Sequence, residues 1–162
     1  MRNKKVLFLT QAAMIASIYV VLTIVFRPFS FGEIQVRIAE ALTILPLFTP
    51  AAIPGLFIGC LIGNMVGGSI LPDMIFGSLA TLLGALFTYL LRNKNKFLAP
   101  IPPILSNTLI IPFVLRYAYG TNLPIYFMML TVGIGEVISC GILGMILCSA
   151  LWKYKYKIFR FL

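Results

Sequence analysis

The sequence predicts an all-α integral membrane protein, and three observations lead to this fold class. Hydrophobic residues make up 60% of the 162 residues and charged residues only 10%, against about 45–50% and about 25% in a soluble domain. The mean hydropathy is +1.03. Long apolar runs such as 15–26 lack the alternation that a transmembrane β-barrel needs. A globule of this size cannot bury so much apolar surface, so we expect the chain to lie in a lipid bilayer.

The chain length predicts six membrane-spanning helices in one compact domain, residues 1–162. A helix needs about 20 apolar residues to cross the hydrocarbon core, so six helices use roughly 120 residues and leave about 40 for connections. The expected helices cover residues 6–26, 38–48, 54–68, 71–91, 103–119 and 124–152.

Proline and glycine set the limits of the first three expected helices. The first apolar run ends before the Arg-Pro pair at 27–28; it is too long for a removed signal peptide and lacks a small-residue cleavage site. The polar stretch 29–37 then forms a loop or a small hairpin. The second helix is short, because prolines at 46, 50 and 54 exclude one continuous helix. The third starts near Pro54, since proline suits a first helical turn, and ends at the glycine pair 67–68.

One polar run and two prolines limit the last three expected helices. Apolar residues dominate 71–91, and the run Arg92-Asn-Lys-Asn-Lys96 is the clearest interior boundary. The fifth helix lies between about Pro103 and Tyr119. The sixth runs from about Pro124 to Trp152, which is long enough for it to tilt or to begin outside the hydrocarbon core.

The basic residues predict the orientation of these helices. Six spans place both termini and the loop after the fourth helix on one side of the membrane. That side holds ten of the 13 basic residues and no acidic residue: Arg2, Lys4, Lys5, Arg92, Lys94, Lys96, Lys153, Lys155, Lys157 and Arg160. The positive-inside rule therefore predicts cytoplasmic termini. All four carboxylates fall on the extracytoplasmic half, so the net charge of +9 reflects topology and does not indicate nucleic-acid binding.

The composition argues against several classes of enzyme. The chain has no histidine, which removes histidine-based catalysis and most zinc chemistry. It has no HExxH, Walker A or dinucleotide-binding glycine motif. Its three cysteines lie in apolar runs without metal-ligand spacing and are interpreted as packing residues. A metal-dependent lipid or prenyl-transfer enzyme usually needs several aspartates, and Asp73 is the only one. We therefore expect no catalysis, cofactor or metal.

Charged residues inside apolar segments are candidate binding residues, because a charge near the bilayer centre costs about 2.5–3.5 kcal/mol. Glu136 lies in the sixth expected helix, where it either forms an ion pair with Arg116 or Arg37 or binds a ligand in a cavity open to the outside. Arg37 and Glu40 either pair along a helix face or bind one small polar ligand, with Gln35 beside them.

Three further polar residues each have a structural alternative. Asn64, near the outer end of the third helix, hydrogen-bonds either a helix end or a ligand. Asn107 in the fifth helix faces either a neighbouring helix or a ligand. Asp73 follows Pro72, and we expect it to cap the fourth helix.

Small residues recur every four positions in two of the expected helices. In the third helix they are the glycines at 55, 59, 63 and 67. Such a stripe allows another backbone to approach closely, and packing within the bundle is the expected use. Ala12 and Ala16 have the same spacing in the first helix.

One segment resembles a known family. The run Gln35-Val-Arg-Ile-Ala-Glu-Ala-Leu-Thr-Ile-Leu-Pro46 strongly resembles the second-helix signature of the QueT family, and the glycine-rich run through Asn64 and the six-helix length do so as well. QueT proteins are the substrate-binding components (S components) of energy-coupling factor (ECF) transporters. The resemblance extends over the whole chain. It implies a protein of the bacterial cell membrane that takes up a queuosine precursor, a 7-deazaguanine such as 7-aminomethyl-7-deazaguanine.

The resemblance also implies protein partners. Such a component binds its ligand from outside and docks on a transmembrane coupling subunit, which two cytoplasmic ATPases drive. This chain then needs no nucleotide site of its own. Ala12 and Ala16 match the Ala-x-x-x-Ala docking pattern on the first helix. An S component for another vitamin or nucleobase, or a structural membrane subunit, is the alternative.

The candidate residues suit a guanine-like ligand. One carboxylate, Glu136 or Glu40, can accept from the ring NH and the 2-amino group together, while Arg37 or Asn64 donates to the carbonyl. A cationic aminomethyl group favours a second carboxylate. The loop 29–37 is expected to close over the base. Aromatic residues near the outer ends are candidates for stacking on the ring: Phe29, Phe31, Tyr117 and Tyr126.

Overall fold

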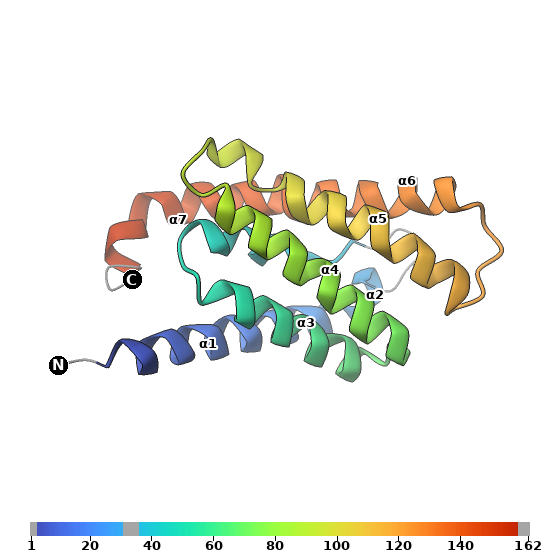
Figure 1. Cartoon of the computed structure of the whole chain (residues 1–162), viewed down its shortest axis with the longest axis horizontal. Helices are drawn as coiled ribbons and strands as arrows, with labels where there is room; N and C mark the ends of the chain where they lie inside the picture. The colour runs from blue at the N-terminus through green and yellow to red at the C-terminus, as the bar shows by residue number, and fades with distance from the viewer. Residues whose placement is uncertain (1–2, 31–35, 159–162) are drawn as a thin grey trace.

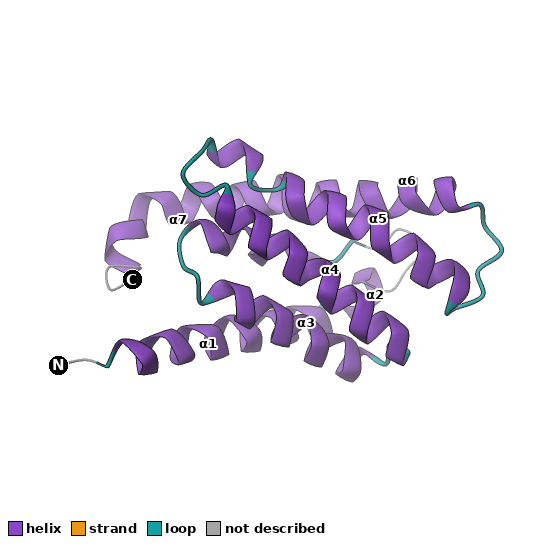
Figure 2. Cartoon of the chain, in the orientation of Figure 1, coloured by secondary structure: helices purple, strands orange, loops and turns teal. Residues whose placement is uncertain are grey.

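The computed structural model describes residues 3–30 and 36–158, and within these ranges it contains helices and connections but no strand (Figure 2). The predicted all-α class is therefore confirmed. The helices lie side by side in one elongated bundle (Figure 1). In chain order the elements are α1 (Lys4–Val25), α2 (Arg27–Ser30), η1 (Ile38–Leu47), α3 (Ala52–Gly67), α4 (Leu71–Leu90), η2 (Lys96–Leu98), α5 (Ile101–Tyr117), α6 (Ile125–Glu136), η3 (Val137–Leu143) and α7 (Gly144–Ile158).

Two of the expected helices differ from a regular α-helix. The expected helix 38–48 is the 3-10 helix η1, whose ten residues include Pro46. Such runs are seldom longer than about 3–4 residues, so η1 is an unusual element. The expected helix 124–152 corresponds to a continuous helical run of α6, η3 and α7, in which η3 is a π-helix. The other four expected helices correspond to α1, α3, α4 and α5, with ends that differ by at most two residues.

The outer surface of the bundle is apolar. Four helical segments of the described chain are long and apolar enough to cross a membrane: Lys4–Val25, Leu71–Leu90, Lys96–Tyr117 and Ile125–Lys155. Large apolar side chains stay exposed along them, for example Val21 (56%), Phe87 (54%) and Leu109 (56%). η1 and α3 are apolar but shorter. The prediction of six spans therefore depends on these two shorter helices.

The helix η1 lies at the centre of the bundle. It contacts α1, α3, α4, α7 and η3, while α1 packs on α3, α3 on α4, α4 on α5 and α5 on α6. Every residue from 39 to 46 is buried. Side chains of η1 therefore face most of the other elements, which makes it the element best placed to hold an internal site.

The predicted close approach at the glycine stripe is found between α1 and α3. A Cβ atom added at Gly55 would lie 2.8 Å from the carbonyl oxygen of Ala12, and one at Gly59 would lie 2.8 Å from Cβ of Tyr19. Ala16 lies at the same interface, with its Cα 3.0 Å from that position at Gly59. Only glycine allows the two backbones to come so close.

The bundle has two chemically different ends (Figure 1). The basic end holds the start of α1, the connection around η2 and the last part of α7, with seven described basic residues: Lys4, Lys5, Arg92, Lys94, Lys96, Lys153 and Lys155. The turn end holds the turn 68–70 and the connection 118–124. The cytoplasmic location of the basic end stays a prediction from the sequence.

Candidate functional site

Two buried carboxylates from distant parts of the sequence meet inside the bundle. Glu40 lies in η1 and Glu136 ends α6, and their side chains are 0% and 3% exposed. One oxygen of each, together with Sγ of Cys140, lies within 4.8 Å of the others. With Tyr19, Thr81 and Asn107, these residues form what we call the carboxylate cluster.

Glu40 has one satisfied and one open carboxylate oxygen. The hydroxyl of Tyr19 in α1 donates a hydrogen bond to Oε1, and Oγ1 of Thr81 in α4 donates to the same oxygen at 3.0 Å. The other oxygen, Oε2, has no hydrogen-bond partner among the described residues. A buried acceptor without a partner is costly, so this atom is a natural contact point for a bound donor.

Glu136 lies where the helix becomes irregular. It is the last residue of α6, directly before the π-helix η3. Sγ of Cys140, one turn later, lies 3.2 Å from its Oε2 and donates to it. Asn107 of α5 is close enough to interact with both Glu136 and Glu40. Its Nδ2 atom makes no hydrogen bond within the described ranges, so the cluster contains an unpartnered donor as well as an unpartnered acceptor.

A second group of polar residues lies toward the turn end. Nη2 of Arg37 is 3.8 Å from Oδ1 of Asp73, and the hydroxyl of Tyr119 donates to Oδ2 of Asp73 at 3.0 Å. Burial and the negative charge of Asp73 raise the pKa of Tyr119. With Asn64, these residues form what we call the turn-end cluster. Arg37 is also close enough to Tyr19 and Glu40 for its charge to act on them. Cys60 lies between the two clusters, because Nδ2 of Asn64 and Oγ1 of Thr81 lie 3.5 Å and 3.4 Å from its Sγ atom.

Asn64 reaches the turn-end cluster across a glycine. Its side chain is 3% exposed, and Nδ2 makes a long contact of 3.5 Å with Sγ of Cys60. A Cβ atom at Gly77 in α4 would lie 3.1 Å from Nδ2 of Asn64, 3.5 Å from Oδ1 of Asp73 and 3.8 Å from Nη1 of Arg37. Gly77 thus lies beside all three polar side chains.

The structure corrects the expected role of Asp73 and gives the contacts of Arg116 and Glu40, for which the sequence left alternatives open. Asp73 does not cap α4: the N-cap residue is Ile70, which makes no side-chain cap bond, and Asp73 instead binds Tyr119 and Arg37. Arg116 is bound to its own connection, since Nη1 donates to the carbonyl of Thr121 at 3.0 Å. In the described contacts of Glu40, its carboxylate binds Tyr19 and Thr81 instead of pairing with Arg37 along a helix face.

Of the remaining expected site residues, some lie outside the described part of the chain and others lie away from the two clusters. Gln35 lies outside the described residues, as do Phe31 and most of the loop 29–37. Tyr117 and Tyr126 are 77% and 76% exposed, so they do not line the buried clusters. Ala12 and Ala16 are buried against α3.

Three members of the carboxylate cluster were not expected from the sequence: Tyr19, Thr81 and Cys140, whose thiol was interpreted as a packing group but contacts Glu136. Tyr19 lies in an apolar run, and its ring is apolar like the neighbouring side chains. Thr81 lies among the apolar residues of α4. The available signal is helical spacing: Tyr19 follows Ala12, Ile15 and Ala16 on the buried face of α1. A hydroxyl on that face must find a polar partner inside the bundle.

The carboxylate cluster can bind a cation or a group of N–H donors. Carboxylates are ligands of hard divalent ions, whereas a thiolate suits softer metals. Glu40, Glu136 and Cys140 therefore combine ligands that favour different metals. Tyr19 and Thr81 already occupy Oε1 of Glu40. The open oxygen, the second carboxylate and the free amide donor suit an organic ligand with both donors and an acceptor.

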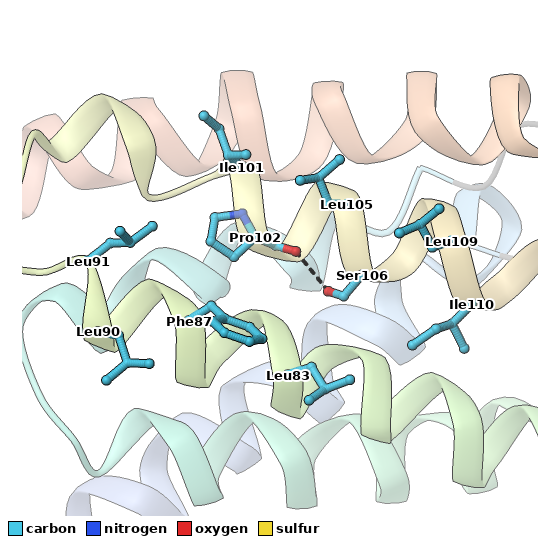
Figure 3. Close-up of a pocket in the computed structure, with 10 residues that line it drawn as sticks. All are labelled: Leu83, Phe87, Leu90, Leu91, Ile101, Pro102, Leu105, Ser106, Leu109 and Ile110. Carbon is cyan, nitrogen blue, oxygen red and sulfur yellow. Dashed lines mark hydrogen bonds between the residues drawn. The ribbon is translucent and has the colours of Figure 1, made fainter.

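An apolar groove of about 430 Å³ lies between α4 and α5 on the outer surface (Figure 3). Its walls include Leu83, Phe87 and Leu105. Its one hydroxyl, Ser106, donates to the carbonyl of Pro102 at 2.9 Å. The groove therefore offers contacts to hydrocarbon and no free polar group for recognising a base.

Comparison with known proteins identifies the family. The sequence model of the QueT transporter matches residues 9–153. The chain belongs to the QueT transporter family. The match contains every described residue of both clusters, so the buried charges lie in the part shared with QueT transporters. The transporter function of this family agrees with the long apolar helices.

One curated relative gives a narrower comparison. The queuosine precursor transporter QueT of Lactococcus lactis subsp. cremoris (strain MG1363) is 32% identical over 98 residues. The alignment covers 59% of this chain and 57% of the relative, so the chain matches a little over half of the relative's length. No solved structure matches this chain.

Proposed function

We propose that this chain is the substrate-binding subunit of an ECF-type importer in the bacterial cell membrane. It captures a queuosine precursor, a 7-deazaguanine such as 7-aminomethyl-7-deazaguanine, from outside. The observation that carries the proposal is the buried pair of Glu40 and Glu136, with an open carboxylate oxygen on Glu40. Family membership and the relative's name support the transport of this class of compound.

The two clusters supply groups that match the edges of a 7-deazaguanine. One carboxylate of the pair accepts hydrogen bonds from the ring NH and the 2-amino group, and the other faces the cationic aminomethyl group. Donors for the ring carbonyl are Asn107, Asn64 and Arg37, all of which are buried. The site is thus complementary to the ligand in charge as well as in hydrogen bonding.

Six spans with cytoplasmic termini complete the proposal. The turn end then faces the outside, and the ligand enters beside the hydrogen bond that joins Tyr119 in the connection 118–124 to Asp73 in α4. Docking on the coupling subunit uses α1. Because Ala12 and Ala16 pack on α3, their contribution to docking is to hold the α1–α3 pair together, and the pair as a whole forms the surface. The partner ATPases supply the energy.

A ligand panel tests the proposed function. The purified protein in detergent is titrated calorimetrically with 7-aminomethyl-7-deazaguanine, guanine, adenine and a pterin. We expect the 7-deazaguanine to bind at least tenfold more tightly than the others. Tighter binding of another base would assign the chain to an S component of different specificity. No binding of any compound by folded protein would favour a structural subunit and contradict the proposal.

A further inference from the structure

We propose that the ligand-free site retains one proton on the Glu40–Glu136 pair and that a cationic group of the ligand displaces it. When the cationic ligand binds, the pair then releases this proton. This inference rests on the proposed function, because it concerns the same site. It adds a property that the function alone does not require, namely a dependence of affinity on pH for cationic ligands and not for neutral ones.

The charges around the pair do not balance if both carboxylates are ionised. From the elements packed on η1, the titratable groups that face Glu40 are Tyr19 of α1, Cys60 of α3 and Cys140 of η3. Each is neutral in its ordinary form. Glu136 faces the same space, and α5 contributes only the neutral Asn107. The described lysines of α7 are at the basic end.

Arg37 is the one positive group that reaches the pair from the described residues, and Asp73 already lies 3.8 Å from it. Arg37 and Asp73 together carry no net charge. Two ionised carboxylates within 4.8 Å of each other would therefore face each other without a counter-charge in a buried site. Two such groups that share a site retain one proton between them.

The hydrogen-bonding pattern indicates where a cationic group of the ligand would bind. Oε1 of Glu40 accepts from two hydroxyls, while its Oε2 and the Nδ2 atom of Asn107 have no partner among the described residues. These open atoms belong to residues that are 0% and 2% exposed, so water from the surface does not satisfy them freely. A protonated amine placed against Oε2 supplies both the donor and the positive charge.

The exchange is balanced in atoms and charge. The ligand enters as an intact ammonium ion. The O–H bond of the protonated carboxyl group breaks, and its proton leaves to the solvent. The net charge of the site is therefore the same before and after binding, because one ammonium ion replaces one proton. A neutral ligand of the same shape leaves the carboxyl group protonated.

Calorimetry of the wild-type protein with two matched ligands tests the exchange. The cation is 7-aminomethyl-7-deazaguanine, and its neutral isostere is 7-hydroxymethyl-7-deazaguanine. Titrations between about pH 6 and 8.5, in buffers of different ionisation enthalpy, measure affinity and protons released. We expect the cation to release close to one proton and its affinity to rise up to tenfold per pH unit. The isostere is expected to release none and to bind independently of pH.

The possible failures are distinguishable. If both ligands bind without proton release, the proposed function stands and the exchange is wrong. If neither binds, both are wrong. An infrared difference spectrum of the wild-type protein gives a second readout that needs no variant. The carbonyl band of a protonated carboxyl group is expected to disappear when the cation binds and to remain with the isostere; an unchanged band with the cation would overturn the exchange.

Discussion

Tyr19 and Glu40 join the first helix to the central 3-10 helix: the phenol hydroxyl of Tyr19 donates to Oε1 of Glu40, and both side chains are almost fully buried. The contact depends on how closely α1 approaches α3. Tyr19 packs directly on Gly59, where an added Cβ atom would lie 2.8 Å from Cβ of Tyr19. The packing of two helices thus positions a donor for the carboxylate cluster.

Removal of the Tyr19 hydroxyl tests this contact. Tyr19→Phe keeps the buried ring and removes one donor from a buried carboxylate. Hydrogen bonds to charged groups contribute about 1.5–3 kcal/mol, so we expect a clear fall in the thermal unfolding midpoint and weaker ligand binding. Tyr154→Phe on the exposed surface of α7 is the matched control. Equal unfolding midpoints for the two variants would show that the hydrogen bond is unimportant.

A methyl group at Gly59 tests the helix approach itself. Gly59→Ala improves helix propensity by about 1 kcal/mol, yet its Cβ would lie 2.8 Å from Tyr19 and 3.0 Å from Cα of Ala16. We expect net destabilisation, because α1 must move away from α3. Gly141→Ala is the control, since the nearest atom there is 3.7 Å away. Thermal unfolding in detergent distinguishes them, and a Gly59→Ala protein as stable as the wild type would contradict the packing.

The positions of the helices could be predicted better than their kind. α4 begins and ends within one residue of the expected limits, because Pro72 and Arg92 mark its ends in the sequence. The 3-10 form of η1 has no such signal. Pro46 is compatible with a short α-helix as well as with a 3-10 helix, and the choice depends on the surrounding elements, which contact η1 on several sides. The π-helix after Glu136 likewise has no signal in the apolar sequence around it.

The candidate site could be predicted where a charge contradicts its apolar surroundings. Glu40 and Glu136 are identifiable for this reason, but their meeting is a property of the tertiary fold. Tyr19 was missed because its aromatic ring fits an apolar helix. Asp73 follows Pro72 near the start of a helix, which resembles a capping position, yet tertiary contacts with Arg37 and Tyr119 decide its role.

Asp73 provides the next test. Asp73→Asn removes the negative partner of the buried Arg37 and weakens the acceptor for Tyr119. Loss of one partner from a buried ion pair costs about 3–5 kcal/mol, and we expect a somewhat smaller loss because the contact is 3.8 Å long. Tyr119→Phe removes the hydrogen bond to Asp73 and the long contact of 3.4 Å from the backbone N–H of Ile70, and should cost about 1 kcal/mol. Chemical denaturation of both variants measures the difference; a larger loss for Tyr119→Phe would refute the ion-pair role.

Variants on the two faces of α1 distinguish a role in packing from a role in docking. Ala16→Leu introduces a bulky group where α1 meets Gly59, so we expect loss of stability in the isolated protein. Ala13 lies on the exposed face of α1, so Ala13→Leu should leave the stability of the isolated protein unchanged. Unfolding of the purified variants and uptake by cells that contain the partner subunits are measured together. Impaired uptake with normal stability for Ala16→Leu would show that its methyl group faces the coupling subunit directly.

The central claim is that the buried carboxylate pair binds the ligand. The most direct measurement is the affinity of 7-aminomethyl-7-deazaguanine for the wild type, Glu40→Gln and Glu136→Gln, with Tyr154→Phe as the control. Each glutamine keeps the shape and removes the charge, and a charge-assisted hydrogen bond contributes about 1.5–3 kcal/mol. We predict a loss of roughly tenfold to hundredfold in each glutamine variant. Unchanged affinity in both folded variants would contradict the account.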